Sequence, residues 1–405
     1  MQVLNSKSEN GIMKGGTYIM KEKNNYTGLL FLVIFLAILL ACMFCPKKVF
    51  SENENRALKS RIDTSAENVF NGDFDNDAET YLTDQFPGRD IMVTVTSDAK
   101  RFMGLKEING VYLGSDGYLI TKTTDEDISD SRASQNAAAL SDFFYRCGID
   151  PVNITVMPVP DAGTVLSGKL PRGAAMFDAD KWMSFLSGCF SGYNFIDMRS
   201  SLSALDRSGE QTFYRTDHHW TTAAAQSAYN VFKNSAGSPD RSDPSGNVST
   251  LIQLSDSFHG SLYSKVMCSD IPYDTVEGLS SDDIGAVNVS IMGRSGVSET
   301  RDTCYDMTYL DKKDKYSVFF GGNYGEVRIE TMSGSRRALV IKDSFANSFV
   351  PFMTGDFSEI DMIDLRYFTG DVDELIRDRG ITDIIVLYEL SNILNDENIT
   401  KLAGS

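Results

Sequence analysis

The sequence predicts an α/β domain with a mainly parallel sheet and helices on both of its faces. The main observation is a series of short apolar runs, each bounded by turn residues or charge, with helical or irregular stretches between them. These runs are residues 153–159, 194–198, 337–341, 360–365 and 383–387. Ligands bind at the carboxyl ends of such strands, and Asp161, Ser344 and Arg366 each lie just past one run. We therefore expect these three side chains to share one rim of the sheet.

Residues 28–45 form the one run of membrane length. They contain no charge and no proline, and as a helix they would span roughly 27 Å, close to the hydrocarbon core of a bilayer. Lysines flank the run on both sides, so the positive-inside rule gives only a weak orientation. The long polar part of the chain that follows the run indicates that this part is exported. We predict a single-pass transmembrane signal-anchor at 28–45, with residues 1–27 as a cytoplasmic tail and the C-terminal part outside the cell.

Two alternatives concern the same N-terminal region. Leu39-Leu40-Ala41-Cys42 fits a bacterial lipobox, which would make Cys42 a lipidated N-terminus, and ordinary signal cleavage is the remaining interpretation. In addition, Lys14-Gly15-Gly16 can be encoded as a ribosome-binding sequence shortly before the codon of Met20. We therefore expect translation to start at Met20 rather than Met1, the alternative being a genuine short cytoplasmic extension.

The chain after the anchor is expected to form two parts. Residues 46–102 are predicted to be a stalk or helical cap, and residues 103–405 the catalytic domain. Outside the predicted sheet, turn residues and helical periodicity define further elements. These are a hairpin at 111–120 around an Asp-Gly turn, helices at 131–147 and 222–234, a loop at 236–250, and a hairpin at 316–332 through Gly321-Gly322-Asn323.

The composition argues against a nucleic-acid partner and against a structural zinc site. The formal net charge is −18 without any basic patch, whereas neutralising phosphates needs concentrated lysine and arginine. Cys42 and Cys45 form a C-x-x-C, but at the end of the apolar run rather than in a loop. Outside the cell the other four cysteines could pair locally, as Cys147–Cys189 and Cys268–Cys304; the alternative is that they pack as small apolar residues.

The tetrad Asp217-His218-His219-Trp220 offers the first parts of an acyl-transfer site. In extended backbone, side chains two residues apart point the same way, so Asp217 can hydrogen-bond His219 while His218 faces away. Asp217 is then the residue that orients the imidazole, and His219 is the general base. We interpret His218 as structural, and Trp220 as a wall of the pocket or part of the core.

Ser344 is the candidate nucleophile. It follows the run 337–341 at a predicted strand-to-helix turn, where a serine is often only a helix cap. The same position exposes a hydroxyl at the sheet edge, beside free amides of a helix N-terminus that could stabilise an oxyanion. Asp343 could supply the cap instead and leave Ser344 free to react.

Two other uses of the histidines compete with this interpretation. His259 is a rival base, but no carboxylate precedes it at the two-residue spacing. Asp217, His218 and His219 could also ligate a transition metal, yet a first shell needs three or four donors and His259 alone remains as nitrogen. We therefore expect no metal and no other cofactor.

Five stretches resemble the signatures of the bacterial DHHW protein family. They are Tyr214-Arg215-Thr216-Asp217-His218-His219-Trp220-Thr221, Val340-Ile341-Lys342-Asp343-Ser344-Phe345-Ala346-Asn347, Phe50-Ser51-Glu52-Asn53-Glu54-Asn55-Arg56, Tyr81-Leu82-Thr83-Asp84-Gln85-Phe86-Pro87-Gly88-Arg89-Asp90 and Ile363-Asp364-Leu365-Arg366-Tyr367-Phe368. That family is similar to the SGNH-hydrolase-like domains of alginate O-acetyltransferases, in which Asp-x-His precedes the catalytic serine. This sequence has the same order.

The resemblance implies both a fold and a reaction. The fold would be an SGNH-hydrolase-like three-layer α/β sandwich with a permuted strand order, and Asp217, His219 and Ser344 would form a catalytic triad. A membrane-bound O-acyltransferase would supply acetyl groups across the membrane, and this protein would transfer them to hydroxyls of a cell-surface or extracellular polysaccharide.

The remaining site candidates follow from this mechanism. The oxyanion would rest on the amide of Ser344 and on Asn347, and the acceptor groove would include Trp220, Arg366 and Tyr367, although Arg366 could instead make a structural ion pair. Two other functions remain open. One is an extracellular carbohydrate or lipid esterase with the same triad, and the other is a non-catalytic scaffold for polysaccharide modification.

Overall fold

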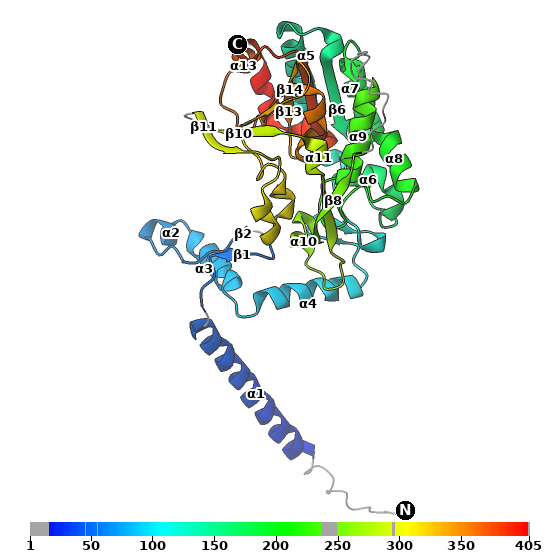
Figure 1. Ribbon diagram of the computed structural model, residues 1–405. Coiled ribbons are helices and arrows are strands. Elements are labelled where there is room, and N and C mark those ends of the chain that lie inside the picture. The colour runs from blue at the N-terminus through cyan, green and yellow to red at the C-terminus, as the bar shows by residue number, and fades with distance from the viewer. Residues whose placement is uncertain (1–15, 45, 55, 236–248, 294–295, 404–405) are drawn as a thin grey trace, which may run out of the picture. The chain divides into compact units, whose positions relative to one another are not determined.

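The computed structural model describes residues 16–44, 46–54, 56–235, 249–293 and 296–403 (Figure 1). The chain divides into two compact units. The first comprises Met1–Glu52 and Arg56–Val93, and the second comprises Asn53–Asn55 and Thr94–Ser405. The expectations about the start of translation and the loop at 236–250 fall mainly outside the described residues.

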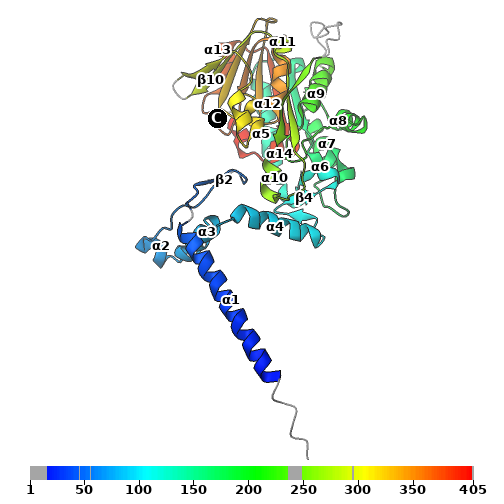
Figure 2. The ribbon, with the colours of Figure 1, turned by 60° about the horizontal axis from the view of Figure 1, so that its bottom comes forward.

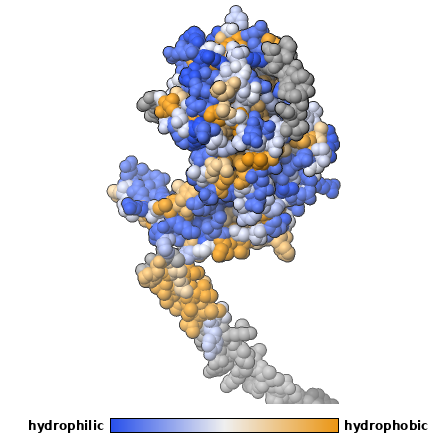
Figure 3. Space-filling model, in the orientation of Figure 1, coloured by the Kyte–Doolittle hydropathy of each residue, from blue (hydrophilic) through white to orange (hydrophobic). Residues whose placement is uncertain are grey.

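The first unit begins with helix α1, Gly16–Phe44. Large apolar side chains are exposed along it, and Figure 3 shows this apolar surface in orange. Over the described residues, no helix meets both the length and the hydropathy that a membrane span requires.

A buried carboxylate organises the rest of the first unit. Strands β1 (Phe50–Ser51) and β2 (Arg56–Ala57) pair, and helices α2 (Ala66–Phe70) and α3 (Asp73–Asp84) follow. Asp84 ends α3 with 5% of its surface exposed and accepts hydrogen bonds from the Arg56 guanidinium, at 2.5 Å, and from the Lys59 amide, at 2.8 Å. Two stretches that carry the family resemblance therefore contact each other here.

The second unit contains a small sheet beside the main one. Helix α4 (Arg89–Phe102) leads into β3 (Glu107–Ile108), β4 (Val111–Leu113) and β5 (Leu119–Thr121), which form an antiparallel sheet. The predicted hairpin at 111–120 is thus confirmed. Asp116 and Gly117 at its turn both have positive φ, which explains the Asp-Gly pair.

Over the described residues, the main sheet has eight strands in the order β11-β10-β12-β14-β13-β15-β6-β7. The predicted parallel part is present, because β14, β13, β15, β6 and β7 run parallel to one another. These strands are Phe357–Ile363, Arg336–Lys342, Asp383–Glu389, Ile154–Val159 and Asn194–Phe195. At the other edge, β12 (Glu326–Thr331), β10 (Val287–Gly293) and β11 (Gly296–Arg301) extend the sheet with antiparallel pairing.

Helices cover both faces of this sheet, as predicted (Figures 1 and 2). Along β13, Ala338 and Val340 point into one apolar core while Leu339 and Ile341 point into the other, as the two-residue period of a strand requires. Helices α8 (Arg199–Arg207), α9 (Thr222–Ser235) and α12 (Ala346–Phe349) contribute to the first core. Helices α5 (Asp130–Arg146), α7 (Ala179–Cys189), α13 (Val372–Arg379) and α14 (Leu390–Asn395) contribute to the second.

The predicted hairpin at 316–332 is wrong. Residues Lys315–Val318 form a 3₁₀ turn, η7, and β12 pairs with β10 and β14 rather than with the segment before Gly321. The aromatic side chains of Tyr316 and Phe319 are buried in the first core, which draws this segment away from the sheet. The strands β8 (Leu251–Phe258) and β9 (Asp274–Leu279) pair separately and were not predicted. β8 is largely exposed, and β9 mixes charged residues and glycine with apolar ones, so neither forms an apolar run.

The expected disulfides are not formed. The four cysteines Cys147, Cys189, Cys268 and Cys304, which all belong to the described part of the second unit, are free thiols. Cys304 is buried in the first core, whereas Cys268 belongs to a separate apolar cluster under the small sheet. Cys147 donates a hydrogen bond to the carbonyl of Phe144, while Cys189 is exposed. The thiols therefore pack individually, in agreement with the alternative interpretation.

Candidate active site

The tetrad lies in a tight loop between α8 and α9. A β-bridge joins Phe213 to Trp220, and the amide of Tyr214 donates to the carbonyl of His219 at 3.1 Å. Buried Asp274, at the start of β9, fixes the loop through hydrogen bonds from its backbone. Its carboxylate accepts hydrogen bonds from the amides of Arg215 and Thr216, at 2.9 and 2.8 Å. The loop is therefore fixed before any substrate arrives.

Asp217 and His219 meet through a bend rather than through the extended backbone that we predicted. Asp217 Oδ1 lies 2.6 Å from His219 Nδ1 and also accepts the His219 amide at 3.1 Å. Its second oxygen accepts the amide of Ser261 at 2.7 Å. Burial opposes ionisation of Asp217, but the neighbouring His218 and His219 and these hydrogen bonds hold the pKa of its carboxyl well below the usual range. Asp217 is therefore a carboxylate at neutral pH.

Gly260 makes room for this carboxylate. A Cβ atom at Gly260 would lie 2.7 Å from Asp217 Cγ and closer still to Cβ and Oδ2. We expect Gly260→Ala to displace Asp217 and lower the turnover by about 10²-fold, because misplacement by about 1 Å has effects of that size. The loss is measured as kcat on an aryl acetate. Gly188→Ala, whose Cβ would meet nothing within 4 Å, is the control; equal activity of the two variants would contradict the close-approach argument.

Ser344 lies where the sequence places it, directly after β13 and before the short helix α12. Asp343 fixes the turn: one oxygen accepts the amide of Phe345 at 2.9 Å, and the other accepts the amide of Glu389 and the side chain of Asn392, both at 2.8 Å. These contacts tie the end of β13 to the end of β15. The hydroxyl of Ser344 does not cap the helix.

The two distant segments meet at His219. Its Nε2 lies 2.7 Å from Ser344 Oγ, so Asp217, His219 and Ser344 form a continuous hydrogen-bonded chain. The side chain of His219 is only 7% exposed. Tyr316 stacks on the imidazole at 3.8 Å between ring centroids, and its hydroxyl donates to the Ser344 carbonyl at 3.0 Å. This arrangement lets a proton pass from Ser344 to His219 while the carboxylate holds the other ring nitrogen.

Asn347 is engaged with other side chains. Its amide nitrogen donates to Asn323 at 3.1 Å, and its oxygen accepts a hydrogen bond from buried Lys342 at 2.8 Å. Burial lowers the pKa of Lys342 to about 8. Asn347 lines a cavity beside Ser344, but one of its two N–H groups is already used. Neither Lys342 nor Asn323 was singled out in the sequence.

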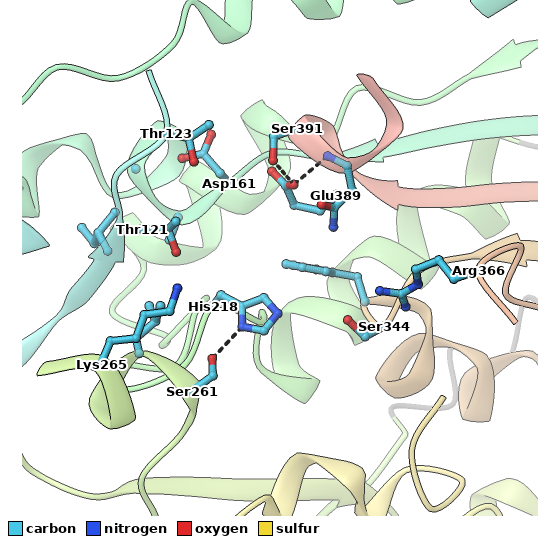
Figure 4. Close-up of a pocket in the computed structure, with 16 residues that line it drawn as sticks. Thr121, Thr123, Asp161, His218, Ser261, Lys265, Ser344, Arg366, Glu389 and Ser391 are labelled. Carbon is cyan, nitrogen blue, oxygen red and sulfur yellow. Dashed lines mark hydrogen bonds between the residues drawn. The ribbon is translucent and has the colours of Figure 1, made fainter. Parts of the chain in front are cut away.

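We predicted that His218 faces away from the site, and this prediction is wrong. Its ring lies 3.9 Å from that of His219, and Nδ1 lies 2.8 Å from Ser261 Oγ. Its other nitrogen is on the side of Ser344 (Figure 4). Burial and the neighbouring His219 lower the pKa of His218, so the ring is neutral at pH 7. The bend at Asp217 explains this placement, because it removes the alternation of an extended strand.

The three predicted substrate-binding residues lie in different settings. Trp220 is fully buried and donates to the carbonyl of Phe345 and the hydroxyl of Ser348, both at 3.0 Å, so it supports the Ser344 turn from the core rather than lining a groove. Arg366 lines the space beside Ser344 but also pairs with Asp364 through two nitrogens, at 2.8 and 2.6 Å. Tyr367 is 55% exposed and borders neither of the two cavities at Ser344.

His259 lies apart from the hydrogen-bonded chain. Its ring is stacked between Tyr263 and Tyr273, each at 3.8 Å between ring centroids, and its Nε2 lies 3.1 Å from the carbonyl of Ile271.

Candidate metal-ligand atoms of Asp217, His218 and His219 lie within 4.8 Å of one another. Asp217 and His219 already share a 2.6 Å hydrogen bond through Oδ1 and Nδ1.

Two cavities open beside Ser344. One has a volume of about 390 Å³ and the other about 280 Å³; His218, Ser261, Ser344 and Arg366 border both. The larger one extends toward Asp161 and Glu389 (Figure 4). The predicted common rim is therefore present, since Asp161, Ser344 and Arg366 line this single cavity.

Glu389 makes the stability of the fold depend on pH. Burial, and then the charge of Asp161, raise the pKa of Glu389 from 4.5 to about 8. Between these values the folded chain keeps a proton that the unfolded chain has lost, so the free energy of unfolding falls as pH rises, by up to about 5 kcal/mol. Glu389→Gln should remove this contribution. Urea unfolding of both proteins at pH 5 and pH 9 measures it, and an identical pH dependence would contradict it.

Two family models match parts of this chain. The family model described as DHHW protein matches residues 190–363, and the model described as SGNH hydrolase-like domain, acetyltransferase AlgX, matches residues 111–260. The first match contains Asp217, His219 and Ser344. The predicted resemblance is thereby confirmed. No curated protein gives a significant match to the chain.

Two solved structures share the fold. A DHHW family protein from Eubacterium siraeum has 23% identity and a TM-score of 0.59, over 74% of this chain and 97% of its own. Bacillus cereus PatB1 with a sulfonyl adduct has 20% identity and a TM-score of 0.60, over 73% of this chain and 98% of its own. The molecule therefore has a mixed α/β fold with a large central sheet, similar to known proteins of the SGNH-like type.

Proposed function

We propose that this protein is a membrane-anchored, extracytoplasmic O-acetyltransferase that acts on a polysaccharide. The carrying observation is the hydrogen-bonded chain from Asp217 through His219 to Ser344, in a chain that resembles an acetyltransferase domain. Its reaction would proceed through an acetyl-serine intermediate and need no cofactor.

In the first half of the reaction, His219 Nε2 takes the proton of Ser344 as Oγ attacks the acetyl carbon of a donor ester. The Ser344 amide and neighbouring donors stabilise the oxyanion. The intermediate collapses, the leaving alcohol receives the proton from His219, and acetyl-Ser344 remains. Asp217 keeps the proton on Nδ1 and stabilises the imidazolium.

In the second half, a sugar hydroxyl enters and His219 removes its proton. The sugar oxygen attacks acetyl-Ser344, and Ser344 leaves with the proton that His219 returns. Water in place of the sugar would give an esterase. The cavities beside Ser344 offer room for an acceptor sugar at the acetyl group.

The experiment separates transferase from esterase. The full chain in detergent is mixed with an aryl acetate, with and without oligosaccharides from the native cell surface, and acetylated sugar and free acetate are quantified. Transfer to sugar supports the proposal. Brisk hydrolysis without transfer to any sugar favours the esterase. Unaltered polysaccharide acetylation in cells that carry Ser344→Ala would favour the scaffold.

We further propose that residues 28–45 anchor the chain and that a membrane-bound O-acyltransferase supplies the acetyl group. The proposal of an anchor rests on the sequence alone, because the run 28–45 is uncharged and has the length of a bilayer's hydrocarbon core. Extraction of membranes with alkaline carbonate tests it, since an anchored protein stays with the lipid. Release to the supernatant would contradict both the anchor and lipidation at Cys42, and mass spectrometry of the N-terminus distinguishes these two.

A further inference from the structure

We propose that the larger cavity beside Ser344 is the acceptor site, and that Glu389 binds a hydroxyl of an uncharged sugar residue there. This inference rests on the proposed acetyl transfer, and it names the class of acceptor and the residues that would receive it.

The parallel strands bring the acidic residues of this cavity to the nucleophile. In the register of neighbouring strands, Lys342 of β13 lies beside Leu387 of β15, and Glu389 lies beside Val159 of β6. Ser344 therefore lies two residues after Lys342, and Glu389 lies two residues after Leu387, the partner of Lys342. Asp161 lies two residues after Val159. The hydrogen bond from the Glu389 amide to Asp343 fixes the spacing of the first two strand ends. All three residues border one cavity of about 390 Å³.

Only one carboxyl oxygen of Glu389 has hydrogen-bond partners among the described residues. Its Oε2 accepts hydrogen bonds from the Ser391 hydroxyl, at 2.6 Å, and from the Asn392 amide, at 3.0 Å, as the cap of α14. Oε1 has no hydrogen-bond partner among the described residues, although the residue is only 7% exposed. A buried polar atom without a partner is costly, so a ligand hydroxyl gains affinity when the Glu389 side chain turns Oε1 toward the cavity that this residue borders.

The chemistry of the wall fits a sugar hydroxyl. Burial raises the pKa values of both Glu389 and Asp161, so Glu389 is an uncharged acid at neutral pH. An uncharged carboxyl both donates and accepts, as a sugar hydroxyl does. The hydroxyls of Thr121 and Thr123 border the same cavity (Figure 4).

The charged groups around the cavity lie away from this acidic wall or are already paired. Lys265 is exposed on the side opposite Glu389, and Arg366 is held by Asp364 (Figure 4). An acidic sugar placed against Glu389 and Asp161 would bring a third carboxyl group into a buried acidic pair. This arrangement disfavours uronic acids at the acidic wall.

The test follows the two half-reactions separately. Glu389→Met replaces the carboxyl by an apolar side chain of similar size, and Glu389→Gln keeps a donor, an acceptor and the cap of α14. We expect Glu389→Met to lower polysaccharide acetylation in cells about tenfold, the size of one lost hydrogen bond to a buried group. It should still form acetyl-Ser344 from an aryl acetate. Glu389→Gln should restore most of the acetylation.

Two further variants guard against a folding artefact. Thr121→Val removes one cavity hydroxyl without changing volume and should reduce acetylation several-fold. Asp361→Asn is the control, because Asp361 is buried with both oxygens unpartnered among the described residues but borders neither cavity. It should acetylate like the wild type.

The following outcomes would overturn either the acceptor site or the proposed function. Loss of acetyl-Ser344 formation in Glu389→Met, or full acetylation in both Glu389→Met and Thr121→Val, would overturn the acceptor site. So would acetyl groups found on uronic acid residues when the native polymer is hydrolysed and analysed by mass spectrometry. If the wild type itself forms no acetyl-Ser344, the proposed function fails instead.

Discussion

Replacing Ser344 by alanine is expected to lower acetyl transfer by about 10³-fold or more. The hydroxyl is the atom that receives the acetyl group, and loss of a nucleophile of this kind leaves only the effect of binding and oxyanion stabilisation. The fold should persist, because among the described residues the hydroxyl hydrogen-bonds only the side chain of His219. Release of the alcohol from an aryl acetate measures the loss.

A serine far from both cavities provides the control for this substitution. Ser141 on α5 donates a hydrogen bond to the carbonyl of Ala137 and borders neither cavity. Ser141→Ala should keep wild-type turnover and a similar unfolding temperature. Wild-type turnover in Ser344→Ala would rule out Ser344 as the nucleophile.

Asp217→Asn is expected to lower kcat by about 10⁴-fold at neutral pH while the fold is retained. The carboxylate holds the proton on Nδ1 of His219, which leaves Nε2 free to accept the proton of Ser344. An amide can turn its N–H toward the ring and select the wrong tautomer. It also removes the negative charge that stabilises the imidazolium. Single-turnover kinetics with an aryl acetate measures the effect on the chemical step.

Asp178→Asn is the matched control, because Asp178 caps α7 through the Lys181 amide and asparagine caps a helix equally well. It should leave the rate unchanged. If Asp217→Asn lowers the rate less than tenfold, the carboxylate does not orient His219 during catalysis.

The reacting residues of the site could be predicted from the sequence, but the residues that position them could not. Asp217, His219 and Ser344 could be selected because a two-residue spacing and a strand end are local patterns. Asp274 and Gly260 could not, because their roles depend on contacts with a loop more than 40 residues away. His218 was misplaced for a related reason, since the bend that turns it into the cavity is made by the Asp217 side chain itself.

The fold was predictable where burial is complete. Strands β6, β13, β14 and β15 are largely buried on both faces, so their sequences are rich in apolar residues. The antiparallel edge was missed because β11 is largely exposed and β12 alternates. The disulfide expectation failed because sequence proximity says nothing about which core a cysteine enters.

The most direct test is the identity of the acetylated residue. The full chain is mixed with an aryl acetate, quenched in acid during the first turnover, digested and analysed by mass spectrometry. We expect one acetyl group on the peptide that contains Ser344, and none in the His219→Ala variant at the same time point. An acetyl group on another residue, such as Ser261, with an unmodified Ser344, would contradict it.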